Sequence, residues 1–330
     1  MMKAALAILI GVSILWPPAL QSQATASTRG PVRVSIVRMP FTGERNAPEL
    51  SPSPDALLAG GLVAALDEMG ARPKLAAAVR LSPAEERQYG AWQRLALANG
   101  HLAQLVSADV RSGDLSVGLL ANCSSLLGML AGVQTAGRSG RAGLVYIDAH
   151  ADFNTPETTL SGMLGGMDVA VAAGLCLTRL RVTSGLETPL RPEEMLLAGV
   201  RDVDPLEKEL LDKHRVPMVS AQDLRGRSAA FRKALAALAA RTDRIYVHVD
   251  LDVLDPAEVP GHSLNVPGGP TSAELGDAIA EMFATHNAVA LGIASTPTGD
   301  RDKDGRSQKA AYELIRAAVR GAQAKSAGRR

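Results

Sequence analysis

The sequence predicts a three-layer α/β/α sandwich with a mostly parallel central sheet. Short apolar runs alternate with segments of helical periodicity along most of the chain, which is the pattern of repeated βα units. Polar clusters follow several of these apolar runs directly. Ligands of parallel sheets bind outside the carboxyl ends of the strands, so the clusters predict a site at one edge of the sheet.

The predicted strands are short and rich in Val, Leu and Ile, as expected for strands that are covered on both faces. They comprise residues 32–37, 75–79, 115–121, 144–147, 195–200, 217–220, 244–249 and 289–294. The predicted helices carry apolar residues three and four positions apart. They comprise residues 55–69, 83–106, 126–136, 168–173, 207–214, 229–240, 272–285 and 308–323.

The N-terminus has the features of an export signal. Lys3 precedes an apolar run over residues 4–16, and residues 24–26 (ATA) provide a small-residue cleavage site. We therefore predict a signal peptide over residues 1–26 and a single catalytic domain over residues 27–330, located in the periplasm or secreted. A membrane anchor is the alternative, but the run is shorter than the ~20 residues of a spanning helix, so no membrane contact is expected after cleavage.

The net charge bears on nucleic-acid binding, and the cysteine content bears on whether a disulfide forms. The net charge of +1 gives no electrostatic footprint for nucleic acid. The chain has two cysteines, Cys123 and Cys176, which could form a disulfide in an oxidising compartment. Their spacing alone does not decide this.

Two clusters of possible metal ligands follow predicted strands. Asp148, His150 and Asp152 occupy alternate positions after one strand, and Asp250 and Asp252 do so after another. Alternate residues of an extended chain point to the same side. Carboxylate and imidazole groups bind divalent cations, and this set is large enough for two ions that share ligands. The alternative is that the aspartates cap the helices that follow.

Both clusters lie in longer motifs that resemble those of a known family. Residues 148–156 (DAHADFNTP), 250–256 (DLDVLDP) and 199–205 (GVRDVDP) resemble signatures of the ureohydrolases, the family of arginases, agmatinases and formimidoylglutamases. The resemblance extends from about Val32 to Ala318, and the third motif is close to the arginase branch. It implies an arginase-like fold, a small-molecule substrate and a homo-oligomer, either a trimer or a hexamer.

The resemblance also implies a binuclear centre of two divalent ions, usually Mn²⁺, with a metal-bridging hydroxide that attacks a guanidinium or amidine carbon. By motif position, Asp148 and Asp250 resemble the bridging ligands, and His150 and Asp252 resemble ligands of one ion. Asp152 resembles a ligand of the other ion that also has a catalytic role, through a hydrogen bond to the hydroxide.

Four further positions resemble substrate-binding residues of arginases. Asn154 and Ser161 match positions that meet an amino-acid carboxylate, and Asp204 and Glu207 match positions near the α-amino group. Carboxylates also suit a cationic amino group on physical grounds. The alternative for Asp204 is a turn before Pro205.

The chain departs from the family pattern at four positions. Cys123 replaces a metal-binding histidine; as a ligand it would favour Zn²⁺ or Fe²⁺ over Mn²⁺, and otherwise it is a buried thiol or a disulfide partner. Gly165 replaces a proton-transfer histidine, and Met163 replaces an asparagine. Ala294 aligns with a glutamate that pairs with guanidinium in the family, so the absence of this glutamate would weaken binding of a guanidinium.

Two other histidines are candidates for supporting roles. His262 lies in a loop after the second metal motif, where it could contact substrate or replace the missing catalytic histidine. His248 alternates in register with Asp250 and Asp252, so it is either a supporting group behind the site or an ordinary strand residue.

The sequence therefore predicts a metal-dependent hydrolase of C–N bonds in a guanidino, amidino or formimidoyl compound. The alternative is a catalytically degenerate member of the same fold that binds metal or ligand. The departures at Cys123, Gly165 and Ala294 motivate this second interpretation.

Overall fold

A computed structural model describes residues 30–43, 50–137 and 140–328. The signal peptide predicted over residues 1–26 lies outside these ranges. The chain from Pro31 to Arg330 forms one compact unit. In the described ranges, every helix is too short or too polar to cross a bilayer.

The central sheet has eight strands in the order β2-β1-β3-β8-β7-β4-β5-β6, and all neighbouring pairs are parallel. This confirms the predicted architecture, with a sheet that is entirely rather than mostly parallel. The strands are β1 (Arg33–Met39), β2 (Arg72–Ala78), β3 (Leu115–Leu120), β4 (Ala142–Ile147), β5 (Met195–Ala198), β6 (Met218–Val219), β7 (Arg244–Asp250) and β8 (Ala288–Ala294).

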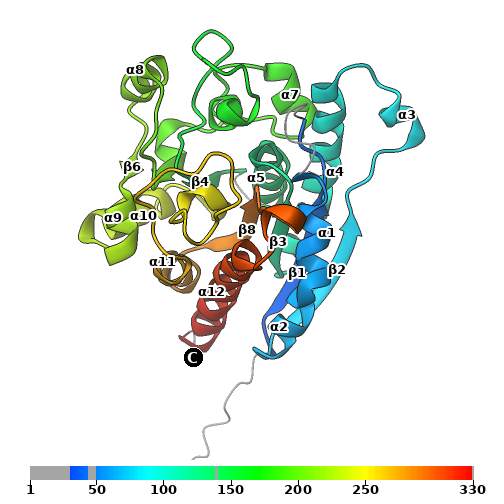
Figure 1. Cartoon of the computed structure of the whole chain (residues 1–330), viewed down its shortest axis with the longest axis vertical. Coiled ribbons are helices and arrows are strands. Elements are labelled where there is room, and N and C mark those ends of the chain that lie inside the picture. Colours follow the sequence, from blue (N-terminus) through cyan, green and yellow to red (C-terminus); the bar gives the residue numbers. More distant parts are fainter. Residues whose placement is uncertain (1–29, 44–49, 138–139, 329–330) are drawn as a thin grey trace, which may run out of the picture. The chain divides into compact units, whose positions relative to one another are not determined.

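Helices cover both faces of the sheet (Figure 1). Strand residues alternate between two cores, as Ile36 and Val37 of β1 illustrate. One core includes apolar residues of α1 (Ser53–Leu57), α2 (Val63–Asp67), α9 (Ala221–Gly226), α10 (Ala229–Ala239), α11 (Ser272–Thr285) and α12 (Arg306–Gly328). The other includes residues of α4 (Ala91–Arg111), α5 (Leu126–Ala136), α6 (Asp168–Ala172), α7 (Thr178–Thr183) and α8 (Pro205–His214).

Two predicted helices are interrupted, and in both a glycine with positive φ explains the break. The predicted helix over 83–106 is wrong as one element, because α3 (Pro83–Glu86) ends before α4 begins and Gly90 between them has φ +92°. The predicted helix over 55–69 contains a π-helical segment, Leu58–Leu62, where Gly61 has φ +102°. Glycine adopts this region without the steric cost of a Cβ. The short helices α7 and α9 were not predicted.

The register of the central strands fixes where the site forms. Tyr146 of β4 pairs with His248 of β7, and Ile147 pairs with Val249. The residues that follow, Asp148 and Asp250, therefore leave neighbouring strands at the same level. β8 and β3 continue the sheet beyond β7, so four adjacent strands deliver their carboxyl ends to one place.

Candidate metal centre

A cavity of about 440 Å³ lies at the carboxyl ends of β3, β8, β7 and β4. Its lining includes every residue that the sequence analysis assigned to the site, namely Cys123, Asp148, His150, Asp152, Asn154, Ser161, Asp204, Glu207, Asp250, Asp252 and His262. The metal-ligand candidates form three overlapping groups, and within each group one ligand atom per residue lies within 4.8 Å of the others.

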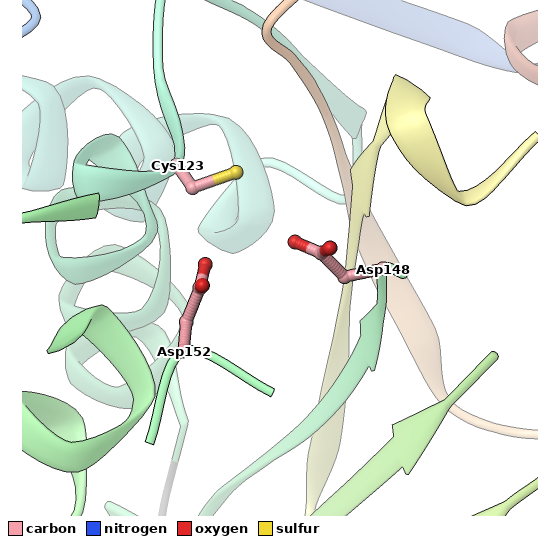
Figure 2. A group of neighbouring side chains, drawn as sticks. All are labelled: Cys123, Asp148 and Asp152. Carbon is pink, nitrogen blue, oxygen red and sulfur yellow. The ribbon is translucent and has the colours of Figure 1, made fainter. Parts of the chain in front are cut away.

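Cys123, Asp148 and Asp152 form the first group, and their side chains converge on one space (Figure 2). Cys123 begins a short 3₁₀ turn after β3, and Asp148 follows β4. Asp152 has φ +48°, a left-handed conformation that turns the chain just after the strand. All three residues are buried, so they offer a sulfur and two carboxylates in a site largely shielded from water.

The second group comprises Asp148, His150 and Asp252. His150 Nδ1 lies 3.1 Å from Asp252 Oδ2 and 3.4 Å from Asp148 Oδ1. The Asp148 carboxylate also accepts a hydrogen bond of 2.7 Å from the His150 backbone N–H. Asp148 thus belongs to two groups, which is the position of a shared ligand.

Asp250, Asp252 and His262 form the third group. His262 Nε2 lies 3.4 Å from Asp250 Oδ1, and the exposed fraction of the His262 side chain is 6%. Asp250 also accepts a hydrogen bond of 2.8 Å from the Cys123 thiol. The structure therefore links the 3₁₀ turn that follows β3 to the last residue of β7.

The buried carboxylates of the three groups repel one another, and this repulsion shifts the pKa values of the site. Burial, and then the carboxylates of Asp148 and a second neighbour, raise the pKa values of Asp152 and Asp252 well above the ordinary range. Burial and then Asp250 raise the pKa of the Cys123 thiol. Burial disfavours a charged His150, but Asp148 and Asp252 outweigh it and raise its pKa to about 12.

Asp250 shows the opposite shift. Burial by itself would raise its pKa, but the contact with His262 holds the pKa of this carboxyl below its ordinary value. So many buried acids with few cationic partners make a site that a divalent cation would stabilise, because it offsets repulsion that the two histidines only partly relieve. The donor set therefore fits metal binding.

The two cysteines are free thiols, so the disulfide alternative was wrong. Cys123 lies in the cavity, where its thiol contacts Asp250. Cys176 lies in the segment between α6 and α7, where it packs against the core that contains Leu186 and Leu190.

Two tyrosines and His248 support the site from within the sheet. The Tyr146 hydroxyl donates to Asp152 Oδ2, and the Tyr146 ring stacks on His248 at 5.1 Å. The Tyr246 hydroxyl lies 2.7 Å from His248 Nδ1, and burial lowers the pKa of His248 to about 4. The sequence pattern pointed to His248 but not to Tyr146, although Tyr146 lies two residues before Asp148 and therefore points to the same side.

The four predicted substrate-binding residues form the outer wall of the cavity. Asp204 directly precedes α8, and its backbone N–H donates to Glu207 Oε2 at 3.2 Å. Glu207 Oε1 accepts from the Phe153 N–H at 2.7 Å. Asn154 Nδ2 donates to Asp204 Oδ2 at 3.1 Å. Ser161 is exposed at the mouth, where its hydroxyl accepts from the backbone of the following loop.

Of three further positions where the chain departs from the family pattern, two line the cavity and one does not. Met163 and Gly165 line the cavity, as predicted. Ala294 does not, because it is buried in the core at the end of β8. Ser295 takes the place in the lining, with φ +56° and its hydroxyl 3.9 Å from Cys123 Sγ. The first side chain after β8 that lines the cavity is therefore a hydroxyl.

Comparison with known proteins agrees with this geometry. The model of the Arginase family matches residues 33–320. An arginase from Bacillus caldovelox is 30% identical over 250 residues, which cover 73% of this chain and 83% of the relative. An N(omega)-hydroxy-L-arginine amidinohydrolase from Streptomyces lavendulae is 33% identical over 192 residues, which cover 58% of this chain and 64% of the relative.

Solved structures give the same result. The native structure of the Bacillus caldovelox arginase at pH 5.6 superposes with a TM-score of 0.75 and 26% identity, covering 88% of this chain and 98% of the other. The parallel sheet, the ligand groups at its carboxyl edge and a family match over nearly the whole described chain lead to one conclusion. The chain belongs to the Arginase family of ureohydrolases.

Proposed function

We propose that the protein is a metal-dependent hydrolase of a C–N bond in a guanidino, amidino or formimidoyl compound. The observation that carries this proposal is the set of three overlapping ligand groups at one cavity, in a chain that belongs to the Arginase family. The similarity to two relatives, an arginase and an N(omega)-hydroxy-L-arginine amidinohydrolase, supports a guanidino amino acid or its N-hydroxy form as the substrate class.

The residues present would hold two divalent ions. Cys123, Asp148 and Asp152 would bind one ion, and His150 and Asp252 would bind the other, with Asp148 and Asp250 shared between them. When bound, such ions lower the pKa of a water molecule between them to generate hydroxide, and they orient the carbon that is attacked. The Asp-rich set favours Mn²⁺, while the thiolate of Cys123 favours Zn²⁺ or Fe²⁺.

The protein's own side chains would position both reactants. Tyr146 holds one oxygen of Asp152, so the other oxygen remains for the ion and the water. At the outer wall, the carboxylate of Asp204 would attract the ammonium group of an amino-acid substrate. Asn154 and Ser161 would meet its carboxylate. Apolar side chains of Leu160 and Leu264 surround the polar floor at the mouth of the cavity.

Metal analysis and product release test the proposal together. We expect about two ions per chain, and release of urea, hydroxyurea, formamide or ammonia from a panel of guanidino, amidino and formimidoyl compounds. Asp250→Ala should abolish turnover, whereas Asp212→Ala, on the exposed side of α8, should not. Fewer than one ion per chain, or no product from any compound by the metal-loaded protein, would refute the hydrolase.

A degenerate member of the fold is the second candidate. The departures at Cys123, Gly165 and Ala294 favour it, because the metal-binding, proton-transfer and guanidinium-pairing groups of the family are replaced there. A metal-loaded protein that binds these compounds in calorimetry without releasing product would support this candidate.

We further propose that the protein is exported and forms a homo-oligomer. The apolar run over residues 4–16 supports export, and membership of the family supports a trimer or hexamer. N-terminal sequencing of protein from the periplasm or medium should start near Ser27. Light scattering should give three or six chains, and a monomer would contradict the second proposal.

A further inference from the structure

We propose that His262 presents a fixed Nε2–H donor to the reacting group, and that the site therefore selects amidines carrying a hydrogen-bond acceptor, such as an N-hydroxyguanidine or a formimidoyl group, over a plain guanidinium. This inference rests on the proposed function, because it concerns the same cavity.

The backbone determines which ring nitrogen of His262 carries the proton. Nδ1 lies 3.2 Å from the backbone nitrogen of Leu264 and accepts its N–H. In neutral imidazole one nitrogen donates and the other accepts. An accepting Nδ1 therefore leaves the proton on Nε2, the nitrogen that is nearer to Asp250.

The same contact argues against His262 as a metal ligand through Nε2. Ligation by Nε2 requires a lone pair there, so the proton would move to Nδ1. Two donors, the Nδ1–H and the Leu264 N–H, would then face each other at 3.2 Å. The third ligand group is thus better described as two carboxylates beside a hydrogen-bond donor.

The Nε2–H group is buried and can still donate a hydrogen bond. The exposed fraction of the His262 side chain is only 6%, and Nε2 makes no hydrogen bond within the described part of the chain. Asp250 Oδ1 lies 3.4 Å away, which is longer than an ordinary N–H···O hydrogen bond, and this carboxylate is itself a proposed ligand of the ions. A buried donor without a good acceptor costs free energy, which an acceptor on the substrate would recover.

The loop that carries His262 is held closely in place. The His262 N–H donates to the Val259 carbonyl at 3.0 Å, and Asn265 Nδ2 donates to the same carbonyl at 2.9 Å. A Cβ on Gly261 would lie 1.8 Å from the Arg301 carbonyl oxygen, so only glycine allows this approach of the two loops. The donor therefore has a defined position, which specificity requires.

At the end of β8 and at Glu207, the lining offers no free carboxylate to pair with a guanidinium. A guanidinium group has five N–H donors and no acceptor. The residue that follows β8 is Ser295, a hydroxyl, and both oxygens of Glu207 already accept backbone N–H groups. An N-hydroxyguanidine offers its hydroxyl oxygen, and a formimidoyl group in its neutral form offers an imine nitrogen.

Paired substrates test the inference with the amino-acid part held constant. For the manganese-loaded protein, we expect kcat/KM for N(omega)-hydroxy-L-arginine to exceed that for L-arginine by at least about tenfold, the value of one hydrogen bond. His262→Ala should bring this ratio close to one. His101→Ala, which removes a histidine paired with Glu85 on α3, should keep the wild-type ratio. Formimidoyl-L-glutamate serves as a separate arm that identifies which acceptor is preferred.

Equal rates for the two substrates in the wild type, or a His262→Ala variant that keeps the wild-type ratio, would overturn the inference while leaving the hydrolase intact. If no compound is turned over, the proposed function fails and binding decides instead. Calorimetry with N-hydroxyguanidine and guanidine should show the same preference, lost in His262→Ala. Equal binding of both would overturn the inference.

Ring NMR of histidine in the zinc-loaded, ¹⁵N-labelled protein provides a measurement that is independent of activity. We expect the His262 resonances to report a proton on Nε2 and an accepting Nδ1. A proton on Nδ1 with a metal-bound Nε2 would overturn the inference and make His262 a ligand.

Discussion

The hydroxyl of Tyr146 offers the sharpest test of how the fold prepares the metal site. It donates to Asp152 Oδ2, and both residues are buried. Tyr146→Phe removes one oxygen and keeps the ring that stacks on His248. The change therefore deletes a hydrogen bond to a carboxylate with almost no change in packing.

The magnitude follows from the charge on Asp152. A hydrogen bond to a charged group contributes about 1.5–3 kcal/mol, and about 1.4 kcal/mol corresponds to a factor of ten. Burial already raises the pKa of Asp152, and the Tyr146 hydroxyl opposes that shift. Without the hydroxyl the pKa rises further, so protons compete better with the cation. We expect metal affinity to fall roughly 10- to 100-fold, as is typical when a group that orients a ligand is lost.

Competition with a chelator at fixed pH measures the affinity directly. Tyr246→Phe is the matched control, since it also removes one buried hydroxyl, but from His248 at 2.7 Å rather than from a carboxylate. The reasoning is refuted if both variants bind the ions as tightly as the wild type, or if the two variants lose affinity equally. Affinity lost only by Tyr146→Phe, and more strongly at lower pH, is the expected result.

Three further predictions concern the ions and the loop beside them. Asp152 and Asp252 have folded-state pKa values raised above their unfolded values, so in the metal-free protein they cost stability as pH rises; the melting temperature in chelator should fall as pH rises above about 4, the ordinary range of a carboxyl, and two bound ions should abolish that slope. Cys123→His should shift the metal content of protein loaded from an equimolar mixture away from Zn²⁺ towards Mn²⁺, and an unchanged ratio would show that the thiol is not a ligand. Gly261→Ala should lower both the melting temperature and turnover, because the new Cβ would overlap the Arg301 carbonyl oxygen, whereas Gly166→Ala, in open space, should melt close to the wild type.

Local sequence patterns were sufficient to predict the strands of the sheet and the aspartate clusters that follow β4 and β7. Each predicted strand is present, because apolar runs of four to seven residues between turns have few alternatives to a buried strand. The aspartates after β4 and β7 face one cavity because parallel strands end on the same side. The strand period of two does not continue past the strand ends, since Asp152 has φ +48° and Asp252 lies in a 3₁₀ turn. The helix over 83–106 was wrong because apolar periodicity continues across Gly90, where the backbone turns.

The sequence by itself determined the fold class, the carboxylate clusters and the family, since each depends on residues that are close together along the chain. Only the tertiary structure decided which distant residues complete the site. Cys123 meets Asp250 across 127 positions, and His262 reaches the same carboxylate from a loop. Ser295, rather than Ala294, lines the cavity because the chain turns after β8. These contacts depend on the order of the strands and on loop geometry, neither of which is encoded in a local period.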